Sequence, residues 1–367
     1  MSNKTKVGVL CGGKSAEHEV SLKSARNIVE AIDKEKYEVV LIAIDKRGQW
    51  FLNNAAQLFL EASNADMPAI HKGNETDGVS LATQGSDAGQ LVRNGDHRPM
   101  GHVDVMFPVL HGPHGEDGTV QGLLKLANIP FVGAGVLGSA VGMDKDVMKR
   151  LLRDAGIPGP NFITFNRQAK VDYGKILGRI GSPFYVKPAN LGSSVGVSRV
   201  KSEKEFGAAV AEAFRYDNKI ILEENVEGRE VECSVLGNED PVASTVGEVI
   251  PQHDFYSYEA KYLDEKGASL EIPADLPPET VKKVRDLAVR AFQVLCCEGM
   301  ARADFFIRGE DEVLVNEINT IPGFTKISMY PKLWEASGLS YSDLIDRLIQ
   351  LALARHGSEQ TLQTSLE

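Results

Sequence analysis

The chain has 367 residues, a net charge of −11 at pH 7 and a hydrophobic fraction of 43%. This length predicts roughly two to three domains with cores large enough to fold without disulfides. The acidic balance excludes a nucleic-acid surface, which needs clustered lysine and arginine, but it permits nucleotide binding. The four cysteines lack zinc-site spacing and are interpreted as free thiols. Because there is no membrane-length apolar run and no signal-peptide pattern, we expect a cytoplasmic protein without membrane or nucleic-acid partners.

The first part of the chain predicts an α/β domain with an open parallel sheet. Apolar runs at 6–10 and 37–45 are typical of buried strands, and apolar residues recur at helical spacing over 22–32. A further strand is expected at 103–110, after a polar stretch at 61–100 that we interpret as a surface excursion. In such sheets the ligand site lies at the carboxyl ends of the parallel strands.

Two smaller units follow. A helix at 145–156 opens the first, which continues with strands and a helix at 183–188, 197–200, 202–214 and 219–225. The last unit has a strand, a helix, a hairpin and a closing helix at 230–237, 278–295, 300–320 and 341–356. We therefore predict three domains, at 1–144, 145–226 and 227–367.

The segment GVLCGGKS at 8–15 matches the P-loop pattern G-x-x-x-x-G-K-S. We set this interpretation aside because Gly8 lies inside the predicted strand, whereas the first glycine of a P-loop follows its strand. Glu17 and Glu19 at the helix entrance would also repel a triphosphate. Backbone amides beside Glu17 suit a zwitterionic amino acid instead, because the carboxylate can hold an ammonium group. The alternative is that Glu17 merely occupies the first helical turn, where acids are favoured.

The segment MARADFFIRGEDEVLVNEINT at 300–320 predicts a β-hairpin with one polar face. Residues two apart on a strand lie on the same face. With the turn centred between residues 310 and 311, Asp304 lies opposite Glu317 and Arg302 lies opposite Asn319. Oxygen ligands favour Mg²⁺ or Mn²⁺ over zinc, and the arginine suits a phosphate or an oxyanion. The alternative is an exposed sheet face with ordinary ion pairs.

Further polar candidates lie in loops and near strand ends. Gly323 occupies a tight turn whose N–H can be offered to an oxyanion, and Ser328 can bind a carboxylate. Lys187 lies in the apolar run FYVKP, where a buried lysine needs an anion, and Lys145 stands where the second unit begins. The small-residue loop at 190–198 can fold its amides over phosphates.

Acidic residues near the strand at 219–225 are candidates for contacts with a nucleoside. Glu223 and Glu224 can meet an adenine, and Glu230 can bind ribose hydroxyls. The tyrosine-rich loop at 254–267 has lysine among aromatic residues and is typical of a lid that excludes water.

Together these residues resemble the D-alanine–D-alanine ligase family of the ATP-grasp superfamily. The matching motifs follow one another along nearly the whole chain: GGKSAEHEVSL (12–22), HGPHGEDGTVQG (111–122), MDKDVMK (143–149), YVKPANLGSSVGVS (185–198), YSYEAKY (256–262), ARADFF and NEINTIPGFTKISMYP. The resemblance implies a three-domain ATP-grasp fold with an N-terminal open parallel-sheet domain. It also implies ATP-dependent formation of D-alanyl-D-alanine through an acyl phosphate, with release of ADP and phosphate, for peptidoglycan precursor synthesis.

The resemblance implies roles for residues near the two D-alanine molecules. Glu17 would bind the ammonium group of the first, and His111 would lie close to it. Ser328 would hold the carboxylate of the second. Ser193 and Tyr262 would hydrogen-bond to Glu17 and close the lid, and Tyr262 favours D-alanine over D-lactate as the second substrate.

Other implied contacts are to the intermediate, the metal ions and the nucleotide. Arg302 and the Gly323 amide would stabilise the tetrahedral intermediate. Two Mg²⁺ or Mn²⁺ ions would be held by Asp304, Glu317 and Asn319. The residues implied at ATP are Lys145 and Lys187 at the α- and β-phosphates, Lys261 at the γ-phosphate, Glu223, Glu224 and Val226 at adenine, Glu230 at ribose, and Ser193, Ser194 and Asn316 nearby.

Several alternatives stay open from the sequence. One keeps the fold but changes the substrate, to D-alanine with D-lactate or to another acid–amine pair. A second is a P-loop nucleotide switch that uses Lys14 and Ser15, and a third is a catalytically dead module that binds an amino acid. Under the ligase interpretation we also expect a homodimer.

Overall fold

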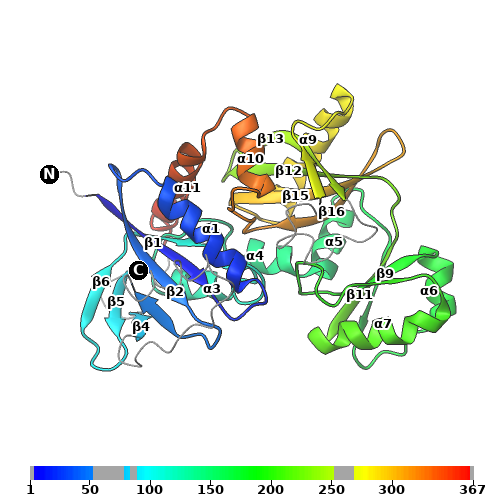
Figure 1. Ribbon diagram of the computed structural model, residues 1–367, viewed down its shortest axis with the longest axis horizontal. Coiled ribbons are helices and arrows are strands. Elements are labelled where there is room, and N and C mark those ends of the chain that lie inside the picture. Colours follow the sequence, from blue (N-terminus) through cyan, green and yellow to red (C-terminus); the bar gives the residue numbers. More distant parts are fainter. Residues whose placement is uncertain (1–3, 53–77, 83–88, 252–267, 364–367) are drawn as a thin grey trace.

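The computed structural model describes residues 4–52, 78–82, 89–251 and 268–363. These residues form three β-sheets, and each sheet is packed with helices (Figure 1). The sheet from the start of the chain lies at the left of Figure 1, the last sheet above, and the small middle sheet at the lower right. The chain is therefore an α/β protein built from three layered units.

The first sheet is mixed, with the strand order β6-β5-β4-β3-β2-β1-β7. One end of the sheet is parallel, as predicted, and consists of β1 (Thr5–Gly12), β2 (Tyr37–Ile44) and β7 (Val105–Pro108). An antiparallel extension was not predicted and consists of β3 (Trp50–Leu52), β4 (Gly78–Leu81), β5 (Gln90–Arg93) and β6 (Pro99–His102). Part of the polar stretch interpreted as a surface excursion thus forms strands. These strands are too short and too polar to give a clear alternating pattern.

Four helices accompany the first sheet or follow it directly in the chain. They are α1 (His18–Ala31), α3 (Thr119–Leu126), α4 (Val136–Met143) and α5 (Lys145–Asp154). Helix α5 starts where the sequence predicts it, because the Asp144 side chain accepts hydrogen bonds from the N–H groups of Asp146 and Val147. Such a cap satisfies donors that have no partner inside the helix.

The middle sheet is antiparallel, with the strand order β10-β9-β11-β8. Its strands are β8 (Phe162–Asn166), β9 (Phe184–Pro188), β10 (Ser198–Val200) and β11 (Lys219–Glu224). Its helices are α6 (Tyr173–Ile180) and α7 (Glu203–Tyr216). The loop between β9 and β10 is the predicted phosphate loop.

The last sheet is also antiparallel, with the strand order β14-β13-β12-β15-β16. Its strands are β12 (Arg229–Gly237), β13 (Val242–Pro251), β14 (Ala268–Glu271), β15 (Gly299–Arg308) and β16 (Glu312–Asn319). Its helices are α9 (Pro278–Val294), α10 (Met329–Ala336) and α11 (Tyr341–Glu359). The hairpin β15–β16 forms one edge of this sheet.

Two helices pack into cores outside their own part of the sequence. Met148 and Leu152 of α5 lie in the core of the last sheet, with buried residues of β12, β15 and β16. Leu344 and Leu348 of α11 lie in the core of the first sheet, beside β1 and α1. The three-domain division at 1–144, 145–226 and 227–367 stays a prediction, and these two helices tie the units together.

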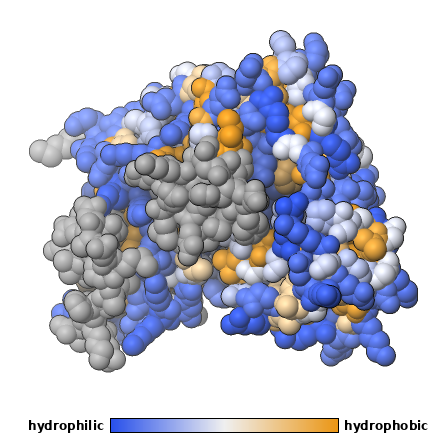
Figure 2. Space-filling model, turned by 45° about the vertical axis from the view of Figure 1, so that its right-hand side comes forward, coloured by the Kyte–Doolittle hydropathy of each residue, from blue (hydrophilic) through white to orange (hydrophobic). Residues whose placement is uncertain are grey.

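On the face shown in Figure 2, most of the coloured residues are hydrophilic, with apolar residues scattered among them. Among the described helices, none combines the length and the apolar character that a membrane crossing requires.

Candidate active site

The hairpin β15–β16 brings the predicted polar residues together. Asp304 pairs with Glu317 and Arg302 pairs with Asn319, as predicted. Nearer the turn, however, Arg308 pairs with Glu312, so the turn is centred on residue 310 and not between 310 and 311. A β-bulge that leaves Asn316 unpaired shifts the register by one residue and restores the predicted pairs. The predicted pairing is therefore confirmed at the site, but it depends on a bulge that the sequence does not indicate.

On this face the arginine and the carboxylates contact one another. Arg302 donates from Nε and Nη2 to the two carboxylate oxygens of Asp304, each over 2.7 Å. Asn319 Nδ2 donates to Asp304 Oδ2 over 3.0 Å. Glu232, on the neighbouring strand β12, places Oε2 2.8 Å from Arg302 Nε. These side chains are mostly shielded from solvent, which strengthens their electrostatic interactions.

Lys145 connects the hairpin to the phosphate loop. Its Nζ lies 3.3 Å from Glu317 Oε2 and donates to the carbonyl of Leu191 over 2.8 Å. Its backbone N–H donates to the carbonyl of Ala189, which fixes the start of α5 against the end of β9. Lys145, which the residue pattern places at a domain boundary, therefore lies between the hairpin and the phosphate loop.

A buried cluster of two lysines and one glutamate lies behind Lys145. Glu223 is only 2% exposed, and its carboxylate oxygens contact Lys149 over 2.5 Å and Lys187 over 2.7 Å. Lys149 also donates to the backbone carbonyl of Asn316 over 2.8 Å, so it connects β11 to the bulge of β16. With both lysines charged, the cluster has one positive charge in excess, which suits a phosphate.

The pKa values of this cluster follow from burial and charge. Burial alone would raise the pKa of Glu223, but Lys149 and Lys187 outweigh it and hold that pKa below its usual range. Burial lowers the pKa of Lys149, because Glu223 compensates only in part. For Lys187 burial acts in the same direction, yet Glu223 reverses the sign and raises its pKa.

The predicted link between Glu17 and the phosphate loop is present. Ser193 Oγ donates to the carboxylate of Glu17, which is buried immediately before α1. Ser193 and Ser194 have positive φ angles, 53° and 59°, so the loop folds tightly at this point. Gly112 permits a close approach, because a Cβ at this position would lie 2.7 Å from Glu17 Oε2.

His111 joins the first unit to the loop after the hairpin. Its Nδ1 lies 3.0 Å from the carbonyl of Ile321, and because a carbonyl only accepts, Nδ1 carries the proton. Burial lowers the pKa of His111, which favours the neutral ring. In the same loop, a Cβ at Gly323 would lie 2.8 Å from Ser328 Oγ, so these two predicted residues are neighbours. Ser328 Oγ accepts the N–H of Thr325 over 2.9 Å.

Glu116 was not predicted from the sequence, although it lies in the motif HGPHGEDG. Its carboxylate accepts the N–H of Gly112 over 2.6 Å and that of Ile321 over 3.1 Å. Burial, and then the nearby charge of Glu17, raise its pKa to about 8. Glu116 therefore holds the loop after the hairpin against the loop that contains His111.

Two other site residues were missed, and both had a signal in the sequence. Lys149 lies four residues after Lys145 and thus on the same face of α5. Glu232 lies two residues after Glu230 and thus on the same face of β12. Neither signal is specific, because an ordinary surface charge shows the same spacing.

The remaining predicted residues are less closely connected to this centre. Glu224 accepts hydrogen bonds from the N–H of Asn161 and from Arg308, each over 2.9 Å, so its carboxylate is held by the protein itself. Val226 and Glu230 are partly buried, in the connection after β11 and at the start of β12. Lys261 and Tyr262 lie outside the described residues, as does the predicted lid loop at 254–267. The roles assigned to these residues at the nucleotide and in the lid stay predictions.

The segment with the P-loop pattern does not have P-loop geometry. Gly8 lies in the middle of β1, paired with Val40 and Met106 on its two neighbours. The Lys14 side chain lies against the turn after β2, because a Cβ at Gly48 would be 2.4 Å from Lys14 Cε. This arrangement argues against a P-loop nucleotide switch.

The hairpin face has the chemistry of a magnesium site. Mg²⁺ is usually held by one or two carboxylates together with substrate phosphates. Asp304 and Glu317 are paired in register, and Asn319 uses Nδ2 toward Asp304, so its Oδ1 is the atom suited to a cation. Within the described ranges, no three histidine, cysteine, aspartate or glutamate side chains form a ready-made metal cluster. The residues therefore fit an ion whose coordination is completed by phosphate and water.

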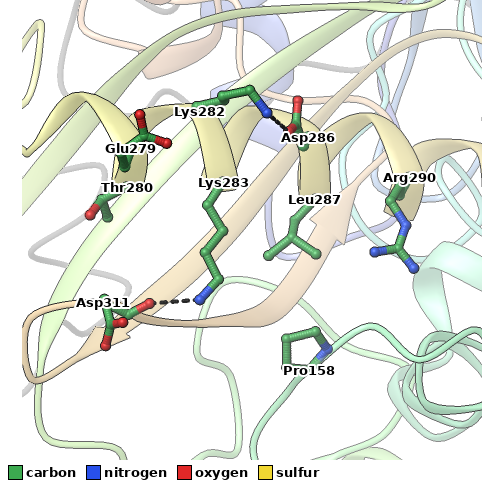
Figure 3. A pocket seen from close by; sticks show the side chains of 9 residues that line it. All are labelled: Pro158, Glu279, Thr280, Lys282, Lys283, Asp286, Leu287, Arg290 and Asp311. Carbon is green, nitrogen blue, oxygen red and sulfur yellow. Dashed lines mark hydrogen bonds and ion pairs between the residues drawn. The ribbon is translucent and has the colours of Figure 1, made fainter.

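A surface cavity of about 550 Å³ lies elsewhere, along α9 and the turn of the hairpin (Figure 3). Lys283 Nζ donates to the backbone carbonyl of Asp311 across it over 2.8 Å, and Lys282 is paired with Asp286. None of the predicted site residues lines this cavity. Its size therefore does not identify it as the site of the chemistry.

Comparisons with known proteins agree with the predicted family. The family models "D-ala D-ala ligase N-terminus" and "D-ala D-ala ligase C-terminus" match residues 6–134 and 151–350. A D-alanine–D-alanine ligase of Shouchella clausii (strain KSM-K16) is 53% identical over 99% of this chain and 98% of the relative.

Solved structures show the same fold along nearly the whole chain. The D-alanine–D-alanine ligase from Coxiella burnetii has a TM-score of 0.84 at 41% identity, over 98% of this chain and 97% of that one. The D-alanine–D-alanine ligase from Bacillus anthracis complexed with ATP has a TM-score of 0.72 at 26% identity, over 97% and 99%. With this ATP-grasp fold and these matches, the chain belongs to the D-alanine–D-alanine ligase family.

Proposed function

We propose that this chain is an ATP-dependent ligase that joins two D-alanine molecules and releases ADP and phosphate, for the synthesis of peptidoglycan precursors. One observation carries the proposal: a continuous series of contacts from the hairpin to Glu17. Lys145 contacts both Glu317 and the Leu191 carbonyl, and Ser193 of the same loop binds Glu17. Groups suited to a metal ion, a phosphate and an ammonium group therefore meet at one junction.

The first step activates a carboxylate, which is a poor electrophile. Glu17 holds the ammonium group of the first D-alanine, and a carboxylate oxygen of that substrate attacks the γ-phosphorus of ATP. An acyl phosphate forms and ADP leaves. Lys145 and Lys187 neutralise charge on the phosphates, and because the substrate carboxylate is itself the nucleophile, no side-chain nucleophile is needed. Asp304, Glu317 and Asn319 would hold two Mg²⁺ or Mn²⁺ ions, which neutralise phosphate charge when bound.

The second step forms the peptide bond. The free amine of the second D-alanine attacks the acyl carbon, a tetrahedral oxyanion forms, and phosphate leaves as the carbonyl is restored. Arg302 and the Gly323 amide stabilise the oxyanion. Ser328, next to Gly323, holds the carboxylate of the attacking molecule, which places its amine near the acyl carbon.

The same proposal assigns the parts of the chain. Residues 1–144 bind the first D-alanine, 145–226 bind the nucleotide, and 227–367 carry the metal site and the lid. Under this proposal the protein is a cytoplasmic homodimer.

The direct test is to incubate the protein with ATP, Mg²⁺ and D-alanine and to measure dipeptide and phosphate. We expect equal amounts of the two products. Phosphate release without dipeptide would contradict the proposal. D-Lactate offered together with D-alanine tests the alternative substrate pair, and a depsipeptide as the main product at neutral pH would replace the proposed second substrate.

Two sets of variants separate the metal assignment from the nucleotide-switch alternative. Glu317→Ala and Asn319→Ala should each lower kcat by about 100-fold, on the order of the loss of one electrostatic stabiliser. Lys14→Ala should leave ATP binding unchanged, as measured by calorimetry. Near-normal turnover of Glu317→Ala and Asn319→Ala would contradict the metal assignment. Loss of ATP binding in Lys14→Ala would support the P-loop interpretation.

A further inference from the structure

The carboxylate of Asp304 is needed for two interactions, one with Arg302 and one with the proposed metal ion. In the structure both of its oxygens accept hydrogen bonds from Arg302, and one of them also accepts from Asn319. Under the proposed function, on which this inference rests, the same oxygens are needed for a metal ion. A carboxylate that turns toward a metal ion can no longer hold a guanidinium through both oxygens, so Arg302 needs another anion.

Glu232 is placed to be that anion. It lies directly opposite Asp304 in the β12–β15 register, and its Oε2 is 2.8 Å from Arg302 Nε. Its side chain is 15% exposed and that of Arg302 is 19% exposed, so water screens this pair only in part. Arg302 therefore lies between two carboxylates, one on its own strand and one on the next.

Glu232 differs from the residues assigned to the metal. No three carboxylate, histidine or cysteine side chains of the described ranges form a metal cluster, so Glu232, Asp304 and Glu317 do not converge on one point. Glu232 instead contacts the arginine that faces Asp304. Glu232 is therefore placed to bind the guanidinium, whereas Asp304 and Glu317 are the carboxylates assigned to the cation.

We infer that Glu232 is a positioning residue that retains Arg302 on the site when Asp304 turns to the metal ion. Because Glu232 takes over the guanidinium, Arg302 stays directed at the reacting groups and does not compete with the cation for Asp304. Neutralising Glu232 has two consequences. Arg302 remains on Asp304, which weakens metal binding, and Arg302 is poorly held whenever the metal is bound, which lowers kcat.

Metal binding without turnover gives the decisive test. Mn²⁺ is titrated into the protein in the presence of ADP, whose phosphates can complete the coordination without turnover, and free Mn²⁺ is measured by electron paramagnetic resonance. We expect Glu232→Gln to weaken Mn²⁺ binding by about tenfold, a typical effect of losing a partner of a metal ligand. In an Arg302→Gln background, Glu232→Gln should have almost no effect, because the competing guanidinium is gone.

Equal weakening in both backgrounds would mean that Glu232 acts only as a distant negative charge, and unchanged Mn²⁺ affinity would mean that it does not act at all. Either result overturns the inference. If wild-type protein binds no Mn²⁺, or if Glu317→Ala binds it normally, the metal assignment of the proposed function has failed instead.

Kinetics and a matched control complete the design. Glu232→Gln should lower kcat by about tenfold, with KM for ATP and D-alanine changed by less than about twofold. Glu248→Gln removes the carboxylate from another arginine pair of the same sheet, in which Arg229 Nε donates to Glu248 over 2.8 Å. This control should leave kcat and Mn²⁺ affinity unchanged. If Glu232→Gln fails to fold, Glu232→Asp shortens the side chain and keeps its charge, and the same losses are expected.

Discussion

The hairpin face and the lysine cluster both combine acidic and basic side chains, but they are built differently. The hairpin face comes from two adjacent strands, and its side chains remain 14–24% exposed at Asp304, Arg302 and Glu317. The cluster around Glu223 draws on α5, β9 and β11, and Glu223 and Lys149 are only 2% and 4% exposed. Charges of the first kind can exchange partners for ligands, whereas Glu223 and Lys149 are fixed in the folded core and only Lys187 of the cluster is partly exposed.

This difference predicts that the two regions respond to substitution in opposite ways. A change in the cluster should appear first as lost stability, because an unpaired buried charge cannot be hydrated. A change on the hairpin face should appear as lost catalysis in a protein that still folds.

The largest effect is expected for Glu223→Gln. Lys149 and Lys187 would stay buried without their anion, so the free energy of unfolding should fall by about 3–5 kcal/mol. Urea denaturation followed by circular dichroism measures this fall. A loss of less than about 1 kcal/mol, within the range of exposed ion pairs, would show that the cluster is no more structural than the hairpin face.

The next effect is expected for Arg302→Lys. Lysine keeps the charge but cannot donate two parallel hydrogen bonds to Asp304 while facing Glu232. We expect kcat to fall by about 10²–10³-fold, as for the loss of an oxyanion donor, while the urea midpoint hardly changes. A large stability loss with normal kcat would reverse the contrast between the two regions.

Glu116 gives an intermediate case, because it is a raised-pKa carboxyl at the border of the site. Its folded pKa of about 8 lies above the usual value, so its protonated form is favoured by folding. Its contribution to stability is therefore complete below about pH 4.5 and is lost as the pH rises through about 8. Thermal unfolding between about pH 5 and pH 9 should show a smaller fall for Glu116→Gln than for wild type. Parallel curves would show that Glu116 does not titrate in this range.

The smallest effect is expected for Lys283→Ala, in the cavity along α9. The bond from Lys283 to the Asp311 carbonyl is exposed, so stability should change by less than about 0.5 kcal/mol. KM for ATP should stay the same. A clear rise in KM for ATP would mean that this cavity takes part in nucleotide binding after all.

The sequence predicted most where the geometry is local. The alternation of residues on two strands was enough to place Asp304 and Arg302 on one face and Glu317 and Asn319 on one face, and the apolar spacing was enough to place α1, α5 and α11. It failed where the contact partners lie far apart in the chain. Nothing near Lys149 indicates Glu223 or the Asn316 carbonyl, and nothing near Glu116 indicates Ile321, because each pair meets only after separate sheets have packed. The bulge at Asn316 was also hidden, since no residue type requires it.

The return of α11 to the first sheet has a consequence for how the protein is made. Leu344 and Leu348 belong to the same core as Val7 and Val9, so that core is incomplete until α11 has been synthesised. A chain emerging from the ribosome can close the small middle sheet early, because its core comes entirely from residues 163–222. The first sheet is thus completed after the middle sheet, although its first strands are translated earlier, and a chain without α11 exposes the apolar surface that this helix would cover.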